Sequence, residues 1–303
     1  MKLSDLSLPE LNRQLRQGFY FRTGAFVVNV KSAIPAVANG LSLMYADYPL
    51  ADRAFADFHV TLTKPHHWRR YFRPQVFFRF EGTSPFSPLP LSQAFPMLEW
   101  GMNWCISSNA HSYLMIHAAV LEKNGRAAIL AAPPGSGKST LCAALMLRGW
   151  RLLSDELTLV RLTDGRIEPV PRPVSLKNAS IAVIRDFDPL AIFSPVVRDT
   201  VKGTVAHLKP SSESVQRAVE TATAAWIIFP QYVKESATVA VPVSAGRAMM
   251  RTADNSFNYG LLGQQGFAAM AALVSRCNCI DFRYSALNEA VQYFDHLPVP
   301  DPA

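Results

Sequence analysis

Residues 131–140, AAPPGSGKST, constrain the fold of this chain more than any other stretch of it. A short apolar run, RAAILAA, leads into them, and the helical pattern KSTLCAALMLRG overlaps their end. A glycine-rich loop between a strand and the first turn of a helix presents backbone N–H groups to an anion. The order of strand, loop and helix therefore predicts an α/β unit with a phosphate site at one edge of its sheet.

This phosphate loop departs at one place from the pattern G-x-x-x-x-G-K-[ST], because Ala132 stands where glycine is usual. Lys138 is predicted to reach the β and γ phosphates, and the Ser139 hydroxyl to bind Mg²⁺. We therefore expect ATP and Mg²⁺ as ligands, against the alternative of an ordinary Gly-Ser surface turn. The predicted nucleotide-binding residues of the loop are Pro134, Gly135, Ser136, Gly137, Lys138, Ser139 and Thr140.

Two acids, Asp155 and Glu156 in LLSDEL, follow the loop after one helix and one turn. We expect their strand to lie next to the strand of the phosphate loop and parallel to it, so that the acids reach the same sheet edge. Neighbouring residues of a strand point to opposite faces, so the acids should differ in role. Asp155 is predicted to be the catalytic base and Glu156 a Mg²⁺ ligand with Ser139, although the acids could exchange roles. The structural alternative is a strand-end pair that caps a surface or binds Arg151.

Three further residues are candidates for the same site. His117, in LMIHAAV, precedes the hairpin signal KNG. A lone histidine in an apolar strand is usually a core residue, but beside the strand of the phosphate loop it could tune the charge of Asp155. Arg172 and Lys177, in PRPVSLKN, could clamp the γ-phosphate or an acidic acceptor, with a basic surface loop as an equal alternative. Lys202 and His207 are weaker candidates of the same kind.

The ordered set of His117, residues 132–140 and LLSDE resembles the catalytic domain of bacterial HPr kinase/phosphorylase. HAAVLEKNGRAAIL, GSGKSTLCAAL and RGWRLLSDE are most similar to a group known as HprK-related kinase A. The resemblance implies a serine kinase with catalytic residues Asp155, His117 and Lys138. It also implies a phosphoenolpyruvate-carboxykinase-like P-loop fold, a small protein or peptide as acceptor, and assembly into a homo-oligomer. Glu156 stands where that family has aspartate, and the glycine-free PRPVSLKNASIAVIRDF puts a phosphorylase activity in doubt.

Prolines in TSPFSPLPLSQAFP, residues 83–96, predict a linker between two domains. We expect a mixed α+β domain over residues 1–94, for acceptor binding or self-association, and the HPr-kinase-like domain over residues 95–303. The predicted class is thus α/β for the kinase domain and α+β overall.

Composition narrows the partners and the compartment. The net charge of +7 suits an anionic partner. The segment KPHHWRRYFRPQ, residues 64–75, could contact single-stranded nucleic acid, but we favour a solvated turn and expect no nucleic-acid partner. No apolar run reaches the roughly 18–20 residues of a membrane span, and the N-terminus lacks the apolar core of a signal peptide, so we expect a cytoplasmic protein. An ATPase or nucleotide sensor without phosphotransfer, and a kinase of a small-molecule hydroxyl, stay open as alternative functions.

Overall fold

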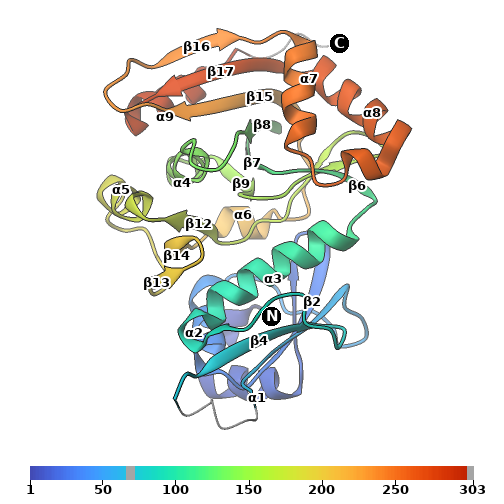
Figure 1. Cartoon of the computed structure of the whole chain (residues 1–303), viewed down its shortest axis with the longest axis vertical. Coiled ribbons are helices and arrows are strands. Elements are labelled where there is room, and N and C mark those ends of the chain that lie inside the picture. The colour runs from blue at the N-terminus through green and yellow to red at the C-terminus, as the bar shows by residue number, and fades with distance from the viewer. Residues whose placement is uncertain (66–71, 299–303) are drawn as a thin grey trace.

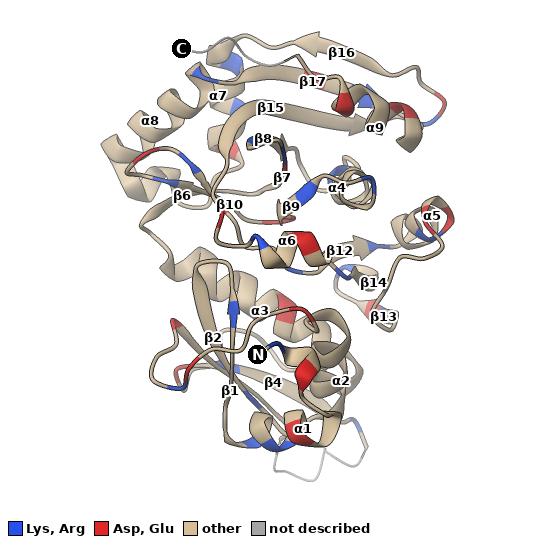
Figure 2. Ribbon diagram, turned by 180° about the vertical axis from the view of Figure 1, so that it is seen from behind, with Lys and Arg blue, Asp and Glu red and all other residues tan. Residues whose placement is uncertain are grey.

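The computed structural model describes residues 1–65 and 72–298 and shows a mixed α/β protein with several sheets (Figure 1). The centre of the basic segment KPHHWRRYFRPQ, residues 66–71, lies outside the described residues. Positive and negative positions are interspersed along the ribbon in both halves of the molecule (Figure 2). Within the described residues, no helix is long and apolar enough to cross a membrane.

The N-terminal part is a sheet with helices packed on it. Its strand order is β1 (Phe19–Thr23), β2 (Phe26–Ser32), β3 (Phe58–Thr63), β4 (Gln75–Phe80) and β5 (Leu89–Pro90). All of these pairs are antiparallel except β2 with β3. The helical segments are η1 (Leu3–Asp5), α1 (Leu8–Gln17), α2 (Pro35–Met44), η3 (Leu91–Gln93) and α3 (Ala94–Asn109). Alternation of buried and exposed residues in β4 is the pattern of a strand with one face on a core.

Helix α3 belongs to this N-terminal core. Leu98, Met102 and Ile106, four residues apart, lie in the same hydrophobic cluster as Phe78 and Leu62 of the sheet. One hydrophobic core therefore includes residues on both sides of position 94. Figure 1 shows α3 at the junction between the N-terminal part and the rest of the chain.

The second part is built on a six-stranded sheet with both faces covered. Its order is β16 (Val239–Pro242), β17 (Asn278–Tyr284), β15 (Thr223–Tyr232), β8 (Arg126–Ala131), β7 (Ala118–Lys123) and β9 (Arg151–Ser154). Ala128 and Leu130 of β8 pack in the cluster that contains α4 (Lys138–Leu147) and α9 (Leu287–Asp295), whereas Ala127 and Ile129 pack in the cluster of α7 (Ala245–Asp254) and α8 (Tyr259–Ser275). Burial on both faces explains why these strands read as continuous apolar runs.

The hairpin predicted at KNG is confirmed. Strands β7 and β8 are antiparallel, and the positive φ angles of Asn124 (55°) and Gly125 (78°) are those of a tight hairpin turn. The prediction that the strand of the acids lies next to the strand of the phosphate loop is wrong. Strand β7 occupies one edge of β8 and β15 the other, so β9 pairs with β7 instead. Two antiparallel steps still leave β9 parallel to β8, so both end at the same sheet edge.

Two stretches that read as single strands are each broken, and both breaks fall at candidate site residues. SYLMIHAAV divides at His117 into β6 (Tyr113–Ile116) and β7, because the His117 N–H donates to the Asn255 carbonyl oxygen at 2.6 Å. WRLLSDELTLV divides after Ser154 into β9 and β10 (Thr158–Arg161), where Ser154 Oγ accepts from the Leu157 N–H at 3.1 Å and closes the bend.

Two small sheets lie between the main sheet and the N-terminal part (Figure 1). One has the order β11 (Ile167–Glu168), β10 and β6, and the other the order β12 (Val174–Lys177), β14 (Gly203–Leu208) and β13 (Val197–Thr200). The remaining helices are α5 (Ala179–Phe187) and α6 (Ser212–Gln216).

Candidate functional site

The phosphate loop turns directly into α4. Gly135 and Gly137 have φ angles of 86° and 88°, a region that favours glycine. A Cβ at Gly137 would also collide with the Tyr284 hydroxyl, which donates to the Gly137 carbonyl oxygen at 2.9 Å. The N–H groups in the first turn of α4 have no partners within the helix, so the loop and the helix start form an anion-binding concavity.

This concavity forms one wall of a cavity of about 930 Å³. Ligand pockets for small molecules have volumes of roughly 300–1,000 Å³, so the cavity can hold a nucleotide. The predicted site residues on its wall are His117, Pro134, Gly135, Gly137, Lys138, Ser139, Thr140, Glu156 and Lys177. Of the remaining predicted residues, Ser136 lies within the loop itself, while Asp155 and Arg172 line a smaller adjacent cavity. Glu156 and Ser175 line both cavities.

Lys138 is the first residue of α4 and is 7% exposed. Its Nζ donates to the carbonyl oxygens of Ala132 (3.2 Å) and His117 (3.3 Å), which holds the ammonium against the loop. Burial lowers the pKa of Lys138, and the negative charges of Asp155 and Glu156 counteract that effect. The structure therefore brings the lysine of the phosphate loop into the field of both acids.

Asp155 is 5% exposed, and its Oδ2 accepts from the Ser175 N–H at 3.1 Å. Its Oδ1 is buried and has no hydrogen-bond partner among the described residues. Burial and the charge of Glu156 raise the pKa of Asp155 to about 6, against the lowering effect of Lys138. The Ser139 hydroxyl and the Ser175 N–H also lower this pKa.

Glu156 sits in a different electrostatic environment. Burial alone would raise its pKa, but the positive charges of Lys202, Arg172 and Lys177 outweigh burial, and the pKa is lowered. Its Oε2 accepts a hydrogen bond from the Asn103 side-chain amide. The two adjacent acids therefore differ in the direction of their pKa shifts.

His117 reaches the site at the N-terminal end of β7. Its ring lies 5.5 Å from the Phe257 ring, centroid to centroid. Burial and the charge of Lys138 lower its pKa to about 4, so the imidazole is neutral at pH 7. Among the charges that act on it, Glu156 is the acid that raises its pKa. At pH 7 the neutral ring carries no charge, so the prediction that His117 tunes the charge of Asp155 is not confirmed. In its protonated form His117 lowers the pKa of Glu156 instead.

Of the basic candidates that follow Glu156 in the chain, some lie at the large cavity and others are buried in the interior. Lys177 lines the large cavity, whereas Arg172 is buried behind it and binds the Asn103 Oδ1 on α3. Lys202 Nζ lies 5.1 Å from the centre of the Trp100 ring. His207 is fully buried against Phe95, and burial lowers its pKa to about 3, so it is a neutral residue of the interior.

Two residues of α3 belong to this site although no motif in the sequence indicated them. Asn103 links Glu156 to Arg172. Glu99 lies 3.9 Å from Arg172 Nη2 through its Oε2, and its Oε1 accepts from the Tyr45 hydroxyl at 2.7 Å. The one signal in the sequence is the single acid in an otherwise uncharged helix, AFPMLEWGMNWCISSN.

The oxygen ligands present fit Mg²⁺. Ser139, Asp155 and Glu156 offer a hydroxyl and two carboxylates, the hard ligands that Mg²⁺ prefers. Among residues 1–65 and 72–298, no group of three or more His, Cys, Asp and Glu could hold a metal by itself. A magnesium ion here would take further ligands from phosphates and water, as it does in nucleotide sites.

Comparison with known proteins gives limited matches. Residues 97–176 match the model of a family described as SynChlorMet cassette protein ScmC, a different name from the family that the motifs resemble. That segment contains the predicted site residues except Lys177 and the weaker candidates Lys202 and His207, and it also contains Glu99 and Asn103. A solved structure of the Hpr(Ser) kinase/phosphatase from Coxiella burnetii is 12% identical over 59% of this chain and 89% of that chain, with a TM-score of 0.28. At that score the likeness does not establish a shared fold. No curated protein matches the chain.

Proposed function

We propose that this protein is an ATP-dependent kinase that transfers the γ-phosphate of ATP to a hydroxyl, that of a serine, on a small protein or peptide. The observation that carries the proposal is the meeting of Lys138, Glu156 and His117 on one cavity at the first turn of α4. Asp155 lies directly behind the wall of that cavity. Lys138, His117 and the adjacent pair Asp155 and Glu156 come from three separate segments. A phosphate-binding lysine, a metal-binding acid and an acid that can act as a base are groups that phosphoryl transfer uses.

The chain's own groups suit a nucleotide bound with its metal. Magnesium-bound ATP would supply the transferable phosphoryl group, and the metal would offset the charge of the phosphates. The N–H groups at the start of α4 hold phosphate oxygens, and Lys138 adds a positive charge beside them. Glu156 stays ionised because its pKa is lowered, so we assign it, with Ser139, to the metal.

Asp155 is assigned the role of base. A pKa of about 6 lies close to neutrality, which suits a group that takes up a proton and releases it again. As the acceptor oxygen forms its bond to phosphorus and the bond to the ADP oxygen breaks, the hydroxyl proton passes to Asp155. Glu156 and Ser175 line both cavities and Asp155 lines the smaller one, so we assign the approach of the acceptor hydroxyl to the place where the two cavities adjoin.

The test is an incubation of the purified full chain with ATP labelled at the γ-phosphate, Mg²⁺, and a fraction of small proteins and peptides. Label on a small protein or peptide supports the proposal. Release of free phosphate alone would favour the ATPase alternative, and label on a small molecule would favour a kinase of small-molecule hydroxyls. Lys138→Ala should abolish turnover, while Lys234→Ala, at an exposed lysine, should leave it unchanged. Self-association and a cytoplasmic location stay predictions.

A further inference from the structure

The smaller cavity behind Asp155 has a volume of about 10 Å³. That is the space of about one water molecule. Helix α3 contributes Glu99 and Trp100 to its wall, and the segments around β9, β12 and β14 contribute Asp155, Arg172, Ser175 and His207. We call this cavity the chamber. All of these side chains except Trp100 are more than nine-tenths buried.

Unpaired polar atoms are concentrated around the chamber. Among the described residues, eleven buried side-chain polar atoms have no hydrogen-bond partner, and seven of them belong to the chamber wall. These seven are Glu99 Oε2, Trp100 Nε1, Asp155 Oδ1, Arg172 Nη1, Ser175 Oγ and both ring nitrogens of His207. Each buried polar atom without a partner costs about 1–3 kcal/mol of folding free energy. A concentration of such atoms in one place therefore indicates a bound group that forms hydrogen bonds with some of them.

The chemistry of the wall selects the ligand. The unpaired atoms include donors, such as Arg172 Nη1 and Trp100 Nε1, and acceptors, such as Asp155 Oδ1 and Glu99 Oε2. A metal ion would meet the Arg172 guanidinium, which repels it, and an apolar group would leave the polar atoms unpaired. Water both donates and accepts, makes up to four hydrogen bonds, and fits the volume. The charged atoms bind it most strongly.

We propose that the chamber binds one water molecule that joins Arg172 Nη1 to Asp155 Oδ1, and that Arg172 is thereby a positioning residue for Asp155. The Ser175 N–H holds only the other oxygen, Oδ2. A carboxylate held at one oxygen can rotate about its last bond, whereas a carboxylate held at both cannot. Arg172 is itself fixed from α3, by the side chain of Asn103 and by the Glu99 carbonyl oxygen at 3.5 Å.

The water site is tested by a high-resolution crystal structure of the full chain. We expect a density peak at hydrogen-bond distance, about 2.7–3.2 Å, from both Arg172 Nη1 and Asp155 Oδ1. In the variant Arg172→Lys the charge remains but the planar fork is lost, so one side chain no longer reaches both Asn103 and the water. The Asp155 carboxylate should then occupy more than one orientation. An empty chamber in the wild type, or an equally fixed Asp155 in the variant, would overturn the proposal.

The kinetic consequence rests on the proposed kinase function. Arg172→Lys should lower kcat roughly 10-fold, since small misplacements of a catalytic group are costly, and leave KM for ATP within about twofold. The matched control is Arg166→Lys, because Arg166 binds Thr221 and Thr223 and does not line either cavity. An unchanged kcat in Arg172→Lys would overturn the positioning role. If the wild type phosphorylates no acceptor, the proposed function fails, and the density and the orientation of Asp155 still decide the present inference.

Discussion

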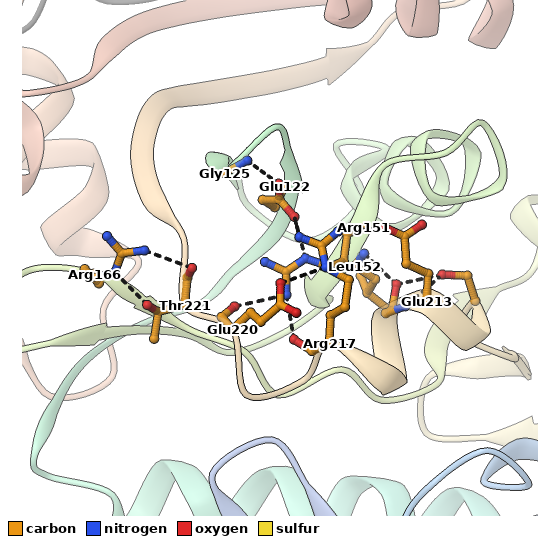
Figure 3. A network of polar contacts seen from close by, with 11 residues as sticks. Glu122, Gly125, Arg151, Leu152, Arg166, Glu213, Arg217, Glu220 and Thr221 are labelled. Carbon is orange, nitrogen blue, oxygen red and sulfur yellow. Dashed lines mark hydrogen bonds and ion pairs between the residues drawn. The ribbon is translucent and has the colours of Figure 1, made fainter.

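The buried charged groups at the two ends of strand β9 differ in how fully their polar atoms are hydrogen-bonded. At its start, Arg151 binds Glu122 through Nε and the carbonyl oxygens of Arg217 and Glu220 through Nη1, at 2.8 and 3.0 Å (Figure 3). The other oxygen of Glu122 accepts from the Gly125 N–H. Just past its end, the buried Oδ1 of Asp155 has no hydrogen-bond partner among residues 1–65 and 72–298.

This difference distinguishes a cluster whose buried polar atoms are paired from the proposed site, where several are not. No side-chain atom of Glu122 or Arg151 is among the unpaired buried atoms of the described residues, whereas the wall of the chamber holds most of them. Because the buried polar atoms of Glu122 and Arg151 are paired within the protein, we expect this cluster to support the fold rather than to bind a ligand. An open network of the same residue types costs stability, and such a cost is usual where a site must bind something.

The largest predicted effect concerns the paired cluster of Glu122 and Arg151 at the start of β9. Arg151→Met should lower the free energy of unfolding by about 3–5 kcal/mol, because Glu122 would stay buried without its main partner. Urea unfolding followed by circular dichroism measures this loss. Glu213→Ala is the control, since it removes only a more exposed pair with Arg217 and should cost about 1 kcal/mol or less. A similarly small loss in Arg151→Met would remove the distinction between the two ends of β9.

The next largest effect concerns Asp155, just past the other end of β9. Asp155→Asn should lower the rate of phosphotransfer on the order of 10²–10³-fold, because the amide cannot accept the proton of the acceptor hydroxyl. Nucleotide affinity should hold, since the loop and Lys138 are untouched, and no stability should be lost. A labelled-ATP assay, a titration with a fluorescent nucleotide and urea unfolding measure the three quantities. Full activity would exclude Asp155 as the base.

The pH dependence of stability sharpens the comparison further. Burial raises the pKa of Glu99 to about 7, although Arg172 and the Tyr45 hydroxyl lower it. Because the folded protein binds this proton more tightly than the unfolded chain, Glu99 contributes stability below pH 4.5 that is lost as the pH rises to about 7. The loss amounts to about 3 kcal/mol at most.

The free energy of unfolding, measured by urea unfolding at several pH values in this range, should therefore change less with pH for Glu99→Gln than for the wild type. Glu213→Gln, at an exposed glutamate, should keep the slope of the wild type. Equal slopes in wild type and Glu99→Gln would show that Glu99 ionises normally and that the two networks do not differ in this respect.

The smallest effect concerns a hydrogen bond to Leu152, near the start of β9. The fully buried Ser214 accepts from the Leu152 N–H at 2.8 Å through its Oγ. Ser214→Ala leaves that N–H without a partner and should cost about 1–2 kcal/mol in urea unfolding. Ser275→Ala, at an exposed serine of α8, should cost less. Equal costs would mean that the Leu152 N–H finds another acceptor.

Local signals carried most of what the sequence could predict. The phosphate loop, helix α4 and the turn at Asn124 and Gly125 depend on a few adjacent residues, and each lies where its pattern indicated. The meeting of Asp155 and Lys138 at one sheet edge was also predicted, although the order of the strands was not. Strand order is decided by which edges remain free, and the pattern of one strand does not contain that information.

The remaining features depend on contacts between distant segments. The break at His117 exists because Asn255, far along the chain, accepts its N–H. The apolar positions of α3 pack in the N-terminal core. Its polar residues Asn103 and Glu99 therefore lie on the side of the helix that faces Glu156 and Arg172. Periodicity predicts α3 correctly as a helix, but it does not say which residue its amide will meet.

Helix α3 also determines how this protein can be recombined with relatives. A chimera joined at residue 94 would pair α3 with a foreign sheet against Leu98 and Met102. A chimera joined after Asn109 would keep that packing but present a foreign loop to the amide that holds Glu156. The N-terminal sheet, α3 and the segment around Arg172 are thus exchangeable only as one block.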